Sequence, residues 1–353
     1  MMTNFQNVDE YGRREFIAHA AKACLGVGLM PMAGSYIHDS VKALTPGARP
    51  AAARHVIYLN MTGAMSHLDT FAPQIDNPKL MHDVKAIPTS ADGVVLSENL
   101  PLTAQHMHNA SVIKTMVSSQ GAHQQASYLM HTSYLQRGTI VHPTFGSWVA
   151  KLSGQINRTI PMNVKIGGGG GGAGFLEAKY GALPIGRPGE GLANSKMASY
   201  LDDTMFQNRI AAAEKLNVNF TAEYPQKQVR AYSDLYRDAI KLMKSEDLNA
   251  FDINKEPESM KELYGTTNFG QGCLLAKRLI ERNVRTVEVS FGGWDTHQNN
   301  FTSLPELCHT MDQAVSALLD DLAGIGKLND TVVVLTTEFG RTPQINQNVG
   351  RDH

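Results

Sequence analysis

Short apolar runs, each bounded by turn-forming residues, recur along the chain beyond about residue 54. Five of them are rich in Val, Ile and Thr, which is the composition of buried β-strands. They cover residues 55–61, 111–117, 160–166, 285–291 and 331–337. We therefore predict a strand at each of these five places.

Longer segments between these runs repeat apolar residues at helical spacing. The predicted helices cover residues 122–134, 145–152, 201–216, 226–244, 268–282 and 304–325. Strands that alternate with helices predict an α/β fold with a doubly wound, mostly parallel sheet and helices on both faces. The helical section of about residues 195–282 lies between two strands, and we expect it to form an insertion that covers one edge of the sheet.

The first 53 residues have the pattern of an export signal and linker. Arg13 and Arg14 precede a weakly apolar stretch, AAKACLGVGLMPMAG, which is typical of a twin-arginine signal. A lysine and a proline interrupt this stretch, so we predict no stable membrane span; an amphipathic first helix is the alternative. We expect recognition by the twin-arginine export machinery, cleavage near residues 51–53, and a periplasmic or secreted domain over residues 54–353.

Composition indicates a globular protein, because 42% of the residues are hydrophobic and 18% are charged. The formal net charge of −1 argues against a nucleic-acid partner or an anionic membrane surface. Cys273 and Cys308 lie in helical patterns, where we expect buried thiols; a single bridge between them is the alternative. The six glycines at 167–172 lack the lysine of a P-loop and the acidic partner of a dinucleotide fingerprint, so we predict a flexible surface loop.

Side chains that can bind metals or move protons follow four of the five predicted strands. In an open parallel sheet, ligands bind beyond the carboxyl ends of the strands, so these side chains would meet at one edge. In chain order they are Ser66, His67, Asp69 and Thr70; His123, Ser127 and His131, which share one helical face; Asp295 and His297; and Glu338, Arg341, Asp352 and His353.

Asp, Glu and His gathered at one place suit Zn²⁺ or Mn²⁺, and two carboxylates could bridge a pair of ions. Asp295 and His297 alternate along an extended segment, so both could face one site. Asp352 and His353 are adjacent and would diverge, so they would serve two ions, or one would bind while the other orients it. Each motif alone also has an ordinary alternative: a packed or capping histidine, a turn at Asp-Thr, or a local ion pair within TEFGRTP.

Five motifs in this order resemble a known family: GAMSHLDTF, AHQQASYLMHTS, GGWDTHQNNF, TEFGRTP and GRDH. It is the domain of unknown function 1501, an exported bacterial family within the alkaline phosphatase and sulfatase superfamily. The resemblance covers about residues 54–353, and a twin-arginine start is common in the family. Members commonly continue beyond GRDH, so the resemblance implies a C-terminally incomplete domain. We accordingly expect Asp352 and His353 to be less ordered than Asp295 and His297; a well-ordered His353 bonded to Asp295 or Glu338 would contradict this.

Enzymes of this superfamily hydrolyse phosphate or sulfate esters with divalent metals. The resemblance therefore implies one or two ions, Zn or Mn, and an anionic ester substrate. Together with the gathering of polar side chains, it leads to a hypothesis in which His123 handles a proton or the transferred group and Arg341 neutralises the anionic oxygens of the ester. The metal ligands in this hypothesis are Asp69, Asp295, His297, Glu338, Asp352 and His353.

Three positions depart from the superfamily pattern. The place of its first Asp ligand holds Asn60 or Thr62, and the place of its Ser, Thr or Cys nucleophile holds His123. Its later Asp-His pair becomes Glu338-Phe339, which keeps a carboxylate but loses the imidazole. In place of the missing nucleophile, the chain could use His123 itself, metal-activated water, or the hydroxyl of Ser118, Ser119 or Ser127.

Two hypotheses about function result. The first is an exported metal-dependent hydrolase of phosphate or sulfate esters. The second is an exported non-catalytic binding or assembly protein that retains the sulfatase-like fold, and the missing nucleophile motivates it. The sequence leaves open the substrate, the metal, the retention of catalysis and the oligomeric state.

Overall fold

The computed structural model describes residues 53–168, 171–195, 197–224 and 226–353. The chain divides into two units, Met1–Ala52 and Ala53–His353, and the second unit is the one described below. The predicted twin-arginine signal lies outside the described residues, and so do two glycines of the run at 167–172.

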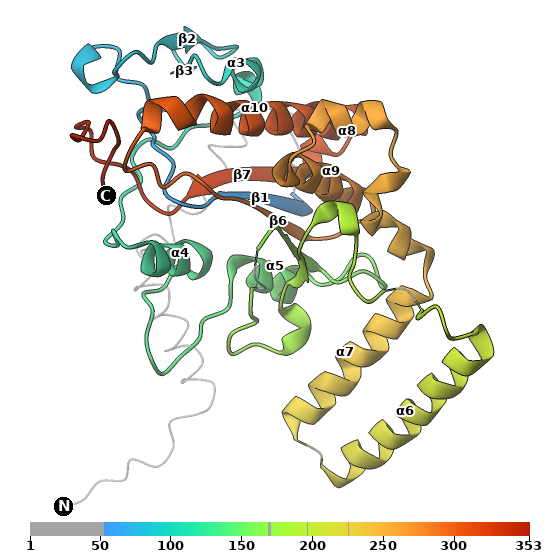
Figure 1. Cartoon of the computed structure of the whole chain (residues 1–353). Helices are drawn as coiled ribbons and strands as arrows, with labels where there is room; N and C mark the ends of the chain where they lie inside the picture. Colours follow the sequence, from blue (N-terminus) through green and yellow to red (C-terminus); the bar gives the residue numbers. More distant parts are fainter. Residues whose placement is uncertain (1–52, 169–170, 196, 225) are drawn as a thin grey trace, which may run out of the picture. The chain divides into compact units, whose positions relative to one another are not determined.

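Five parallel strands form the main sheet, in the order β5-β4-β6-β1-β7. Their bounds are β1 His55–Met61, β4 Asn163–Ile166, β5 Leu183–Ile185, β6 Thr286–Phe291 and β7 Thr331–Thr337. Helices precede or follow these strands and pack on both faces of the sheet (Figure 1). The predicted α/β class with a mostly parallel sheet is therefore confirmed.

The core lies between the sheet and two long helices, α9 (Asn268–Glu281) and α10 (Asn300–Gly324). Figure 1 shows these helices on one face of the sheet, and α4 (His123–Thr132) with α5 (Phe145–Ser153) on the other. The strands differ in pattern: β1 and β7 contain unbroken apolar stretches, whereas β4 and β6 alternate apolar side chains with polar ones such as Lys165 and Glu288, which pair with each other.

The section between β5 and β6 is helical. Its α-helices are α6 (Asp203–Glu223), α7 (Lys227–Met243), α8 (Glu258–Tyr264) and α9. A small antiparallel pair, β2 (Ala86–Pro88) with β3 (Val95–Ser97), precedes α3 (Pro101–Ala104). The 3₁₀-helices are η1 Pro78–Leu80, η2 Met107–Asn109, η3 Ala178–Tyr180, η4 Pro188–Glu190, η5 Glu246–Phe251, η6 Ile253–Lys255 and η7 Leu328–Asp330. Among the described helices, none combines the length and the apolarity needed to cross a bilayer.

Four predicted strands and all six predicted helices are present, with most bounds shifted by a few residues; α6 ends at Glu223, seven residues beyond the predicted end. The strand predicted at 111–117 is wrong, because that segment is irregular and Ile113 and Val117 are 70% and 94% exposed. Its β-branched residues favour a strand, but no neighbouring strand in the described residues pairs with it. The sheet instead includes β5, which sequence reasoning missed because three residues containing a proline give almost no signal.

Cys273 and Cys308 are free and buried, as predicted. Burial raises the pKa of both thiols, so neither is a reactive thiolate.

Candidate metal centre

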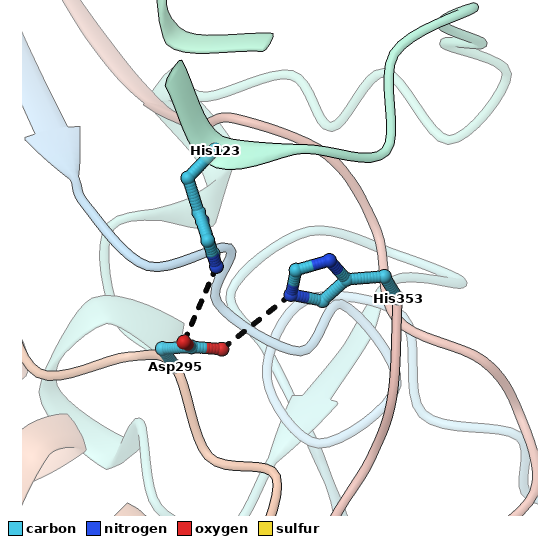
Figure 2. Close-up of side chains that lie close together, drawn as sticks. All are labelled: His123, Asp295 and His353. Atoms are coloured by element: carbon cyan, nitrogen blue, oxygen red, sulfur yellow. Dashed lines mark ion pairs between the residues drawn. The ribbon is translucent and has the colours of Figure 1, made fainter. Parts of the chain in front are cut away.

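Three elements bring polar side chains together at the carboxyl edge of the sheet. His123 is the first residue of α4, Asp295 lies in the loop after β6, and Glu338 directly follows β7. Figure 2 shows the rings of His123 and His353 directed at the carboxylate of Asp295. The convergence at one sheet edge is the arrangement that parallel strands produce.

Two glycines, one in the loop after β1 and one near the end of the chain, allow these segments to approach the Asp295–His297 loop closely. Gly63 has φ +107°, and a Cβ there would lie 2.6 Å from the backbone nitrogen of Asp295. A Cβ on Gly350 would lie 2.1 Å from the carbonyl carbon of His297. Real side chains do not fit at such distances, so both positions require glycine for the loops to meet.

The carboxylate of Asp295 is the centre of the cluster. His123 Nε2 lies 3.2 Å from Asp295 Oδ2. His297 Nε2 and His353 Nε2 lie 3.1 Å and 3.6 Å from Asp295 Oδ1. The two Nε2 atoms of His297 and His353 are themselves 3.1 Å apart. Three imidazole nitrogens therefore surround one carboxylate.

The other nitrogen of each ring fixes which atom carries the proton. Each Nδ1 faces an oxygen that only accepts hydrogen bonds, either an ionised carboxylate or a backbone carbonyl, so Nδ1 must donate. The pairs are His123 Nδ1 with Glu338 Oε2, His297 Nδ1 with Asp352 Oδ1 at 2.7 Å, and His353 Nδ1 with the Gly121 carbonyl at 2.7 Å. In the neutral rings, each Nε2 consequently presents a lone pair to the cluster.

These lone pairs fit a divalent cation. Two lone pairs 3.1 Å apart, those of His297 and His353, repel each other unless a cation or a proton lies between them. His123 Nε2 is buried and has no hydrogen-bond partner. Ligand atoms around tetrahedral Zn²⁺ lie about 3.3–3.4 Å apart, given Zn–N distances of about 2.0–2.1 Å. The ligand atoms of His123, Asp295 and His353 all lie within 4.8 Å of one another, so the donor set suits such an ion.

His297 lies beside this set of three. Its Nε2 accepts a long N–H bond from Arg341 at 3.4 Å, which shows that the lone pair is on this atom. Asp352 holds the opposite side of the ring and receives a further bond from Asn346 at 3.0 Å. Those two hydrogen bonds, first His297 and then Asn346, hold the pKa of Asp352 below its usual range.

Charge keeps Asp295 ionised. Burial by itself would raise the pKa of Asp295, but the hydrogen bond and charge of Arg341, with His123 and His297, outweigh it and lower the pKa. The Arg341 Nη2 to Asp295 Oδ1 distance is 2.5 Å. The carboxylate is therefore available as an anionic ligand over the whole neutral range.

The guanidinium of Arg341 is buried and fully used inside the protein. It donates to Asp295 and to the backbone carbonyls of Ala64 at 2.8 Å, Gly63 at 2.5 Å and Arg351 at 3.0 Å. These bonds join the loops after β1, β6 and β7, which makes Arg341 a positioning residue. The structure does not leave its donors free for the ester oxygens to which the sequence assigned them.

Asp69, which sequence reasoning placed among the metal ligands, is instead fully buried against Arg351. Arg351 Nε and Nη2 each lie 2.6 Å from one Asp69 oxygen, and Ser66 and Asn300 also donate to this carboxylate. Four donors face this buried carboxylate, so Asp69 is the partner of Arg351 and not a member of the candidate centre. Nothing local in the sequence signals that Arg351 is its partner.

The last two residues make defined contacts. His353 Nε2 lies 3.6 Å from Asp295 Oδ1, beyond hydrogen-bond distance. The expected difference in order between Asp352-His353 and Asp295-His297 stays a prediction. Asp352 does not orient its neighbour: it contacts the ring of His297, while the Gly121 carbonyl contacts His353, whose Nε2 faces the centre.

His131, two turns after His123 in α4, belongs to a different group. Its Nε2 lies 3.0 Å from Glu288, which also receives Lys165 at 2.8 Å. Burial by itself would lower the pKa of His131, but the hydrogen bond and charge of Glu288 raise it. The structure therefore separates two of the three polar residues that share one face of this helix.

Residues 53–353 match a protein family that is described only as "Protein of unknown function (DUF1501)". A search of curated proteins finds no match, and neither does a search of solved structures. Because the match covers nearly the whole described chain, this protein belongs to the DUF1501 family.

Proposed function

We propose that this protein is a metal-dependent hydrolase of phosphate or sulfate esters. A divalent ion, Zn²⁺ or Mn²⁺, would be held by His123, Asp295 and His353. The observation that carries the proposal is the set of imidazoles whose Nδ1 atoms are tied to oxygens while their Nε2 atoms converge on Asp295. Such an oxygen–histidine–metal arrangement is the usual way in which proteins orient histidine ligands.

Each residue has a distinct role in this proposal. Glu338 and the Gly121 carbonyl fix the rings of His123 and His353, so that Nε2 is the ligand atom. The bound ion supplies the positive charge that polarises an ester oxygen. His297, whose side chain is 41% exposed, lies beside the ion site, and in this proposal its Nε2 lone pair accepts a proton from the attacking water.

Two further parts of the proposal rest on sequence motifs. The order of the five motifs supports membership of the alkaline phosphatase and sulfatase superfamily, which favours phosphate or sulfate esters over other esters. Arg13 and Arg14, followed by the weakly apolar stretch, support export by the twin-arginine pathway to the periplasm or beyond.

One observation favours the second candidate function, a non-catalytic binding or assembly protein. The guanidinium of Arg341 is 0% exposed and its donors are taken by carbonyls and by Asp295, so the cation assigned to ester recognition is not free. A site that binds an ion without recognising an anionic ester would have this feature.

Turnover of two chromogenic esters separates the candidates. The purified chain, loaded with Zn²⁺ or Mn²⁺, should hydrolyse 4-nitrophenyl phosphate or 4-nitrophenyl sulfate, and Asp295→Asn should abolish the activity. His309→Gln is the matched control, because His309 is an exposed histidine on α10. A stoichiometrically bound ion with no turnover of either ester would contradict the hydrolase and favour the binding protein.

A further inference from the structure

Helix α6 carries a row of exposed residues that no other described part of the chain covers. Of its 21 residues only Ile210 is buried. Leu216 and Phe220 are 69% and 52% exposed, although large apolar side chains normally stabilise a long helix by packing. Two large apolar side chains of α6 therefore remain more than half exposed within the described part of the chain.

The exposed residues form a narrow stripe, which we call the α6 stripe. At 100° per residue, its members all fall within 40° of the direction of Leu216. They are Arg209, Ala212, Leu216, Phe220 and Glu223, and all five are exposed. Figure 1 shows α6 beside α7, antiparallel to it.

The neighbouring helix, α7, lies on the opposite side of α6. A groove of about 800 Å³ between α6 and α7 is lined on the α6 side by Glu214, Asn217, Val218, Thr221 and Ala222. By the same helical angles, these residues point at least 100° away from Leu216. The α6 stripe therefore faces away from α7.

The order of residues in the stripe is symmetric about Leu216. Ala212 and Phe220 lie four residues before and after it, and Arg209 and Glu223 lie seven residues before and after it. If a second copy of α6 packs antiparallel with Leu216 on the two-fold axis, each large Phe220 meets a small Ala212. Each Arg209 then meets a Glu223 of opposite charge. A two-fold interface requires this kind of self-complementarity.

The two charged residues are available for such a contact. Neither Arg209 nor Glu223 has an ion-pair partner among the described residues; Arg209 makes only a contact over the ring of Tyr200, at 5.6 Å. Like charges would be brought together if the helices packed in parallel, because each residue would then meet its own copy. The charge pattern therefore selects the antiparallel arrangement.

We propose that the α6 stripe is a homodimer contact, in which two copies of this chain pack α6 against α6 antiparallel around Leu216. The contact from Arg209 to Glu223 is about 21 Å long and about 10 Å wide. This area is well below the roughly 800 Å² per partner of a stable dimer, so the association is reversible and lies in the micromolar to millimolar range.

Sedimentation equilibrium over about 5 µM to 1 mM protein tests the proposal. The wild-type chain should shift from monomer to dimer within this range. Arg209→Glu should weaken dimerisation about 2- to 30-fold, because two exposed ion pairs become repulsive contacts. Lys215→Glu is the matched control, since it makes the same charge change one residue away from Leu216 and off the stripe.

A charge swap tests the antiparallel geometry separately. Arg209→Glu combined with Glu223→Arg should restore dimerisation, because the pairs re-form with reversed signs. Leu216→Cys should form an intermolecular disulfide between the two copies of residue 216 on oxidation, identified by mass spectrometry. All of these residues are exposed on the helix surface, so the variants leave the core intact.

A chain that remains monomeric at 1 mM would overturn the proposal, and so would a double variant that dimerises as weakly as Arg209→Glu alone. If the monomer instead cosediments with lipid vesicles, and Leu216→Lys prevents this, the stripe is a membrane contact and the dimer is refuted. Dimerisation unchanged in Arg209→Glu and absent in Lys215→Glu would place the interface elsewhere.

Discussion

Replacement of Asp69 by Asn tests how the loop that carries His353 is held. The substitution keeps the shape of the side chain but removes the negative charge that faces Arg351. Both side chains are completely buried, and two N–H to oxygen distances of 2.6 Å join them. Asn can accept only through one oxygen, so at least one of these bonds is lost and the guanidinium charge remains buried without its counter-charge.

Breaking a buried pair in this way lowers the free energy of unfolding by about 3–5 kcal/mol. The unit Ala53–His353 has about 300 residues, so its unfolding entropy is about 0.6 kcal/mol/K at roughly 2.1 cal/mol/K per residue. Division of the two predicts a fall in Tm of about 5–8 °C. The lower end applies if Asn keeps one of the two bonds.

The assay is thermal unfolding followed by circular dichroism, at one pH and without added metal. Asp76→Asn is the matched control, because it makes the same chemical change at an exposed carboxylate a few residues along the chain. This control should unfold within about 0.5 kcal/mol of the wild type. An Asp69→Asn protein that unfolds within 1 °C of the control would refute the reasoning.

Three further predictions concern the loops, the buried pair and the metal centre. Gly63→Ala should lower the free energy of unfolding, measured in urea, by about 1–3 kcal/mol more than Gly93→Ala does. Both glycines have positive φ, but only Gly63 has backbone atoms within 4 Å of the added Cβ. Equal losses in the two variants would contradict this. The pKa of His131 is raised above its ordinary value of 6.5. Its pairing with Glu288 therefore stabilises the fold fully at pH values below 6.5, and this stabilisation is lost as the pH rises past the raised pKa. Wild-type Tm should therefore fall more steeply above pH 6.5 than that of His131→Asn, and parallel profiles would contradict the pairing. Glu338→Gln should weaken Zn²⁺ affinity about 10-fold in a chelator competition, because His123 loses its charged partner; an unchanged affinity would show that this carboxylate does not orient the ring.

Sequence patterns were sufficient for the parts of the fold that local physics determines. β1 and β7 begin and end where the sequence predicted, because each contains an unbroken run of apolar and β-branched residues bounded by turn signals. The segment 111–117 has the same local character, yet it is irregular, because pairing depends on a neighbour that is distant in sequence. β5 is the opposite case, because its sequence gives only a weak strand signal, yet it forms a strand by pairing with β4.

The candidate centre, likewise, could be predicted from the sequence only in part. The rule that ligands gather at the carboxyl ends of parallel strands placed Asp295, His297 and Glu338 at one edge, after β6 and β7. His123 joins them from the start of α4, although the strand predicted before it is absent. The rule could not distinguish a side chain that faces the ion site from one that orients such a side chain. This distinction depends on which nitrogen of each histidine ring faces an oxygen. The burial of Arg341 also escaped the rule, since the three carbonyls that Arg341 binds carry no side-chain signal.

Metal binding by the purified chain tests the central claim most directly. Isothermal titration with Zn²⁺ and with Mn²⁺, together with mass spectrometry of the folded protein, should be performed on the wild type, His123→Gln, Asp295→Asn and the control His309→Gln. We predict one tightly bound ion per chain in the wild type and the control, and the loss of that ion in both site variants while their folds remain intact. A wild-type chain that binds no ion stoichiometrically, or site variants that bind as the control does, would contradict the account.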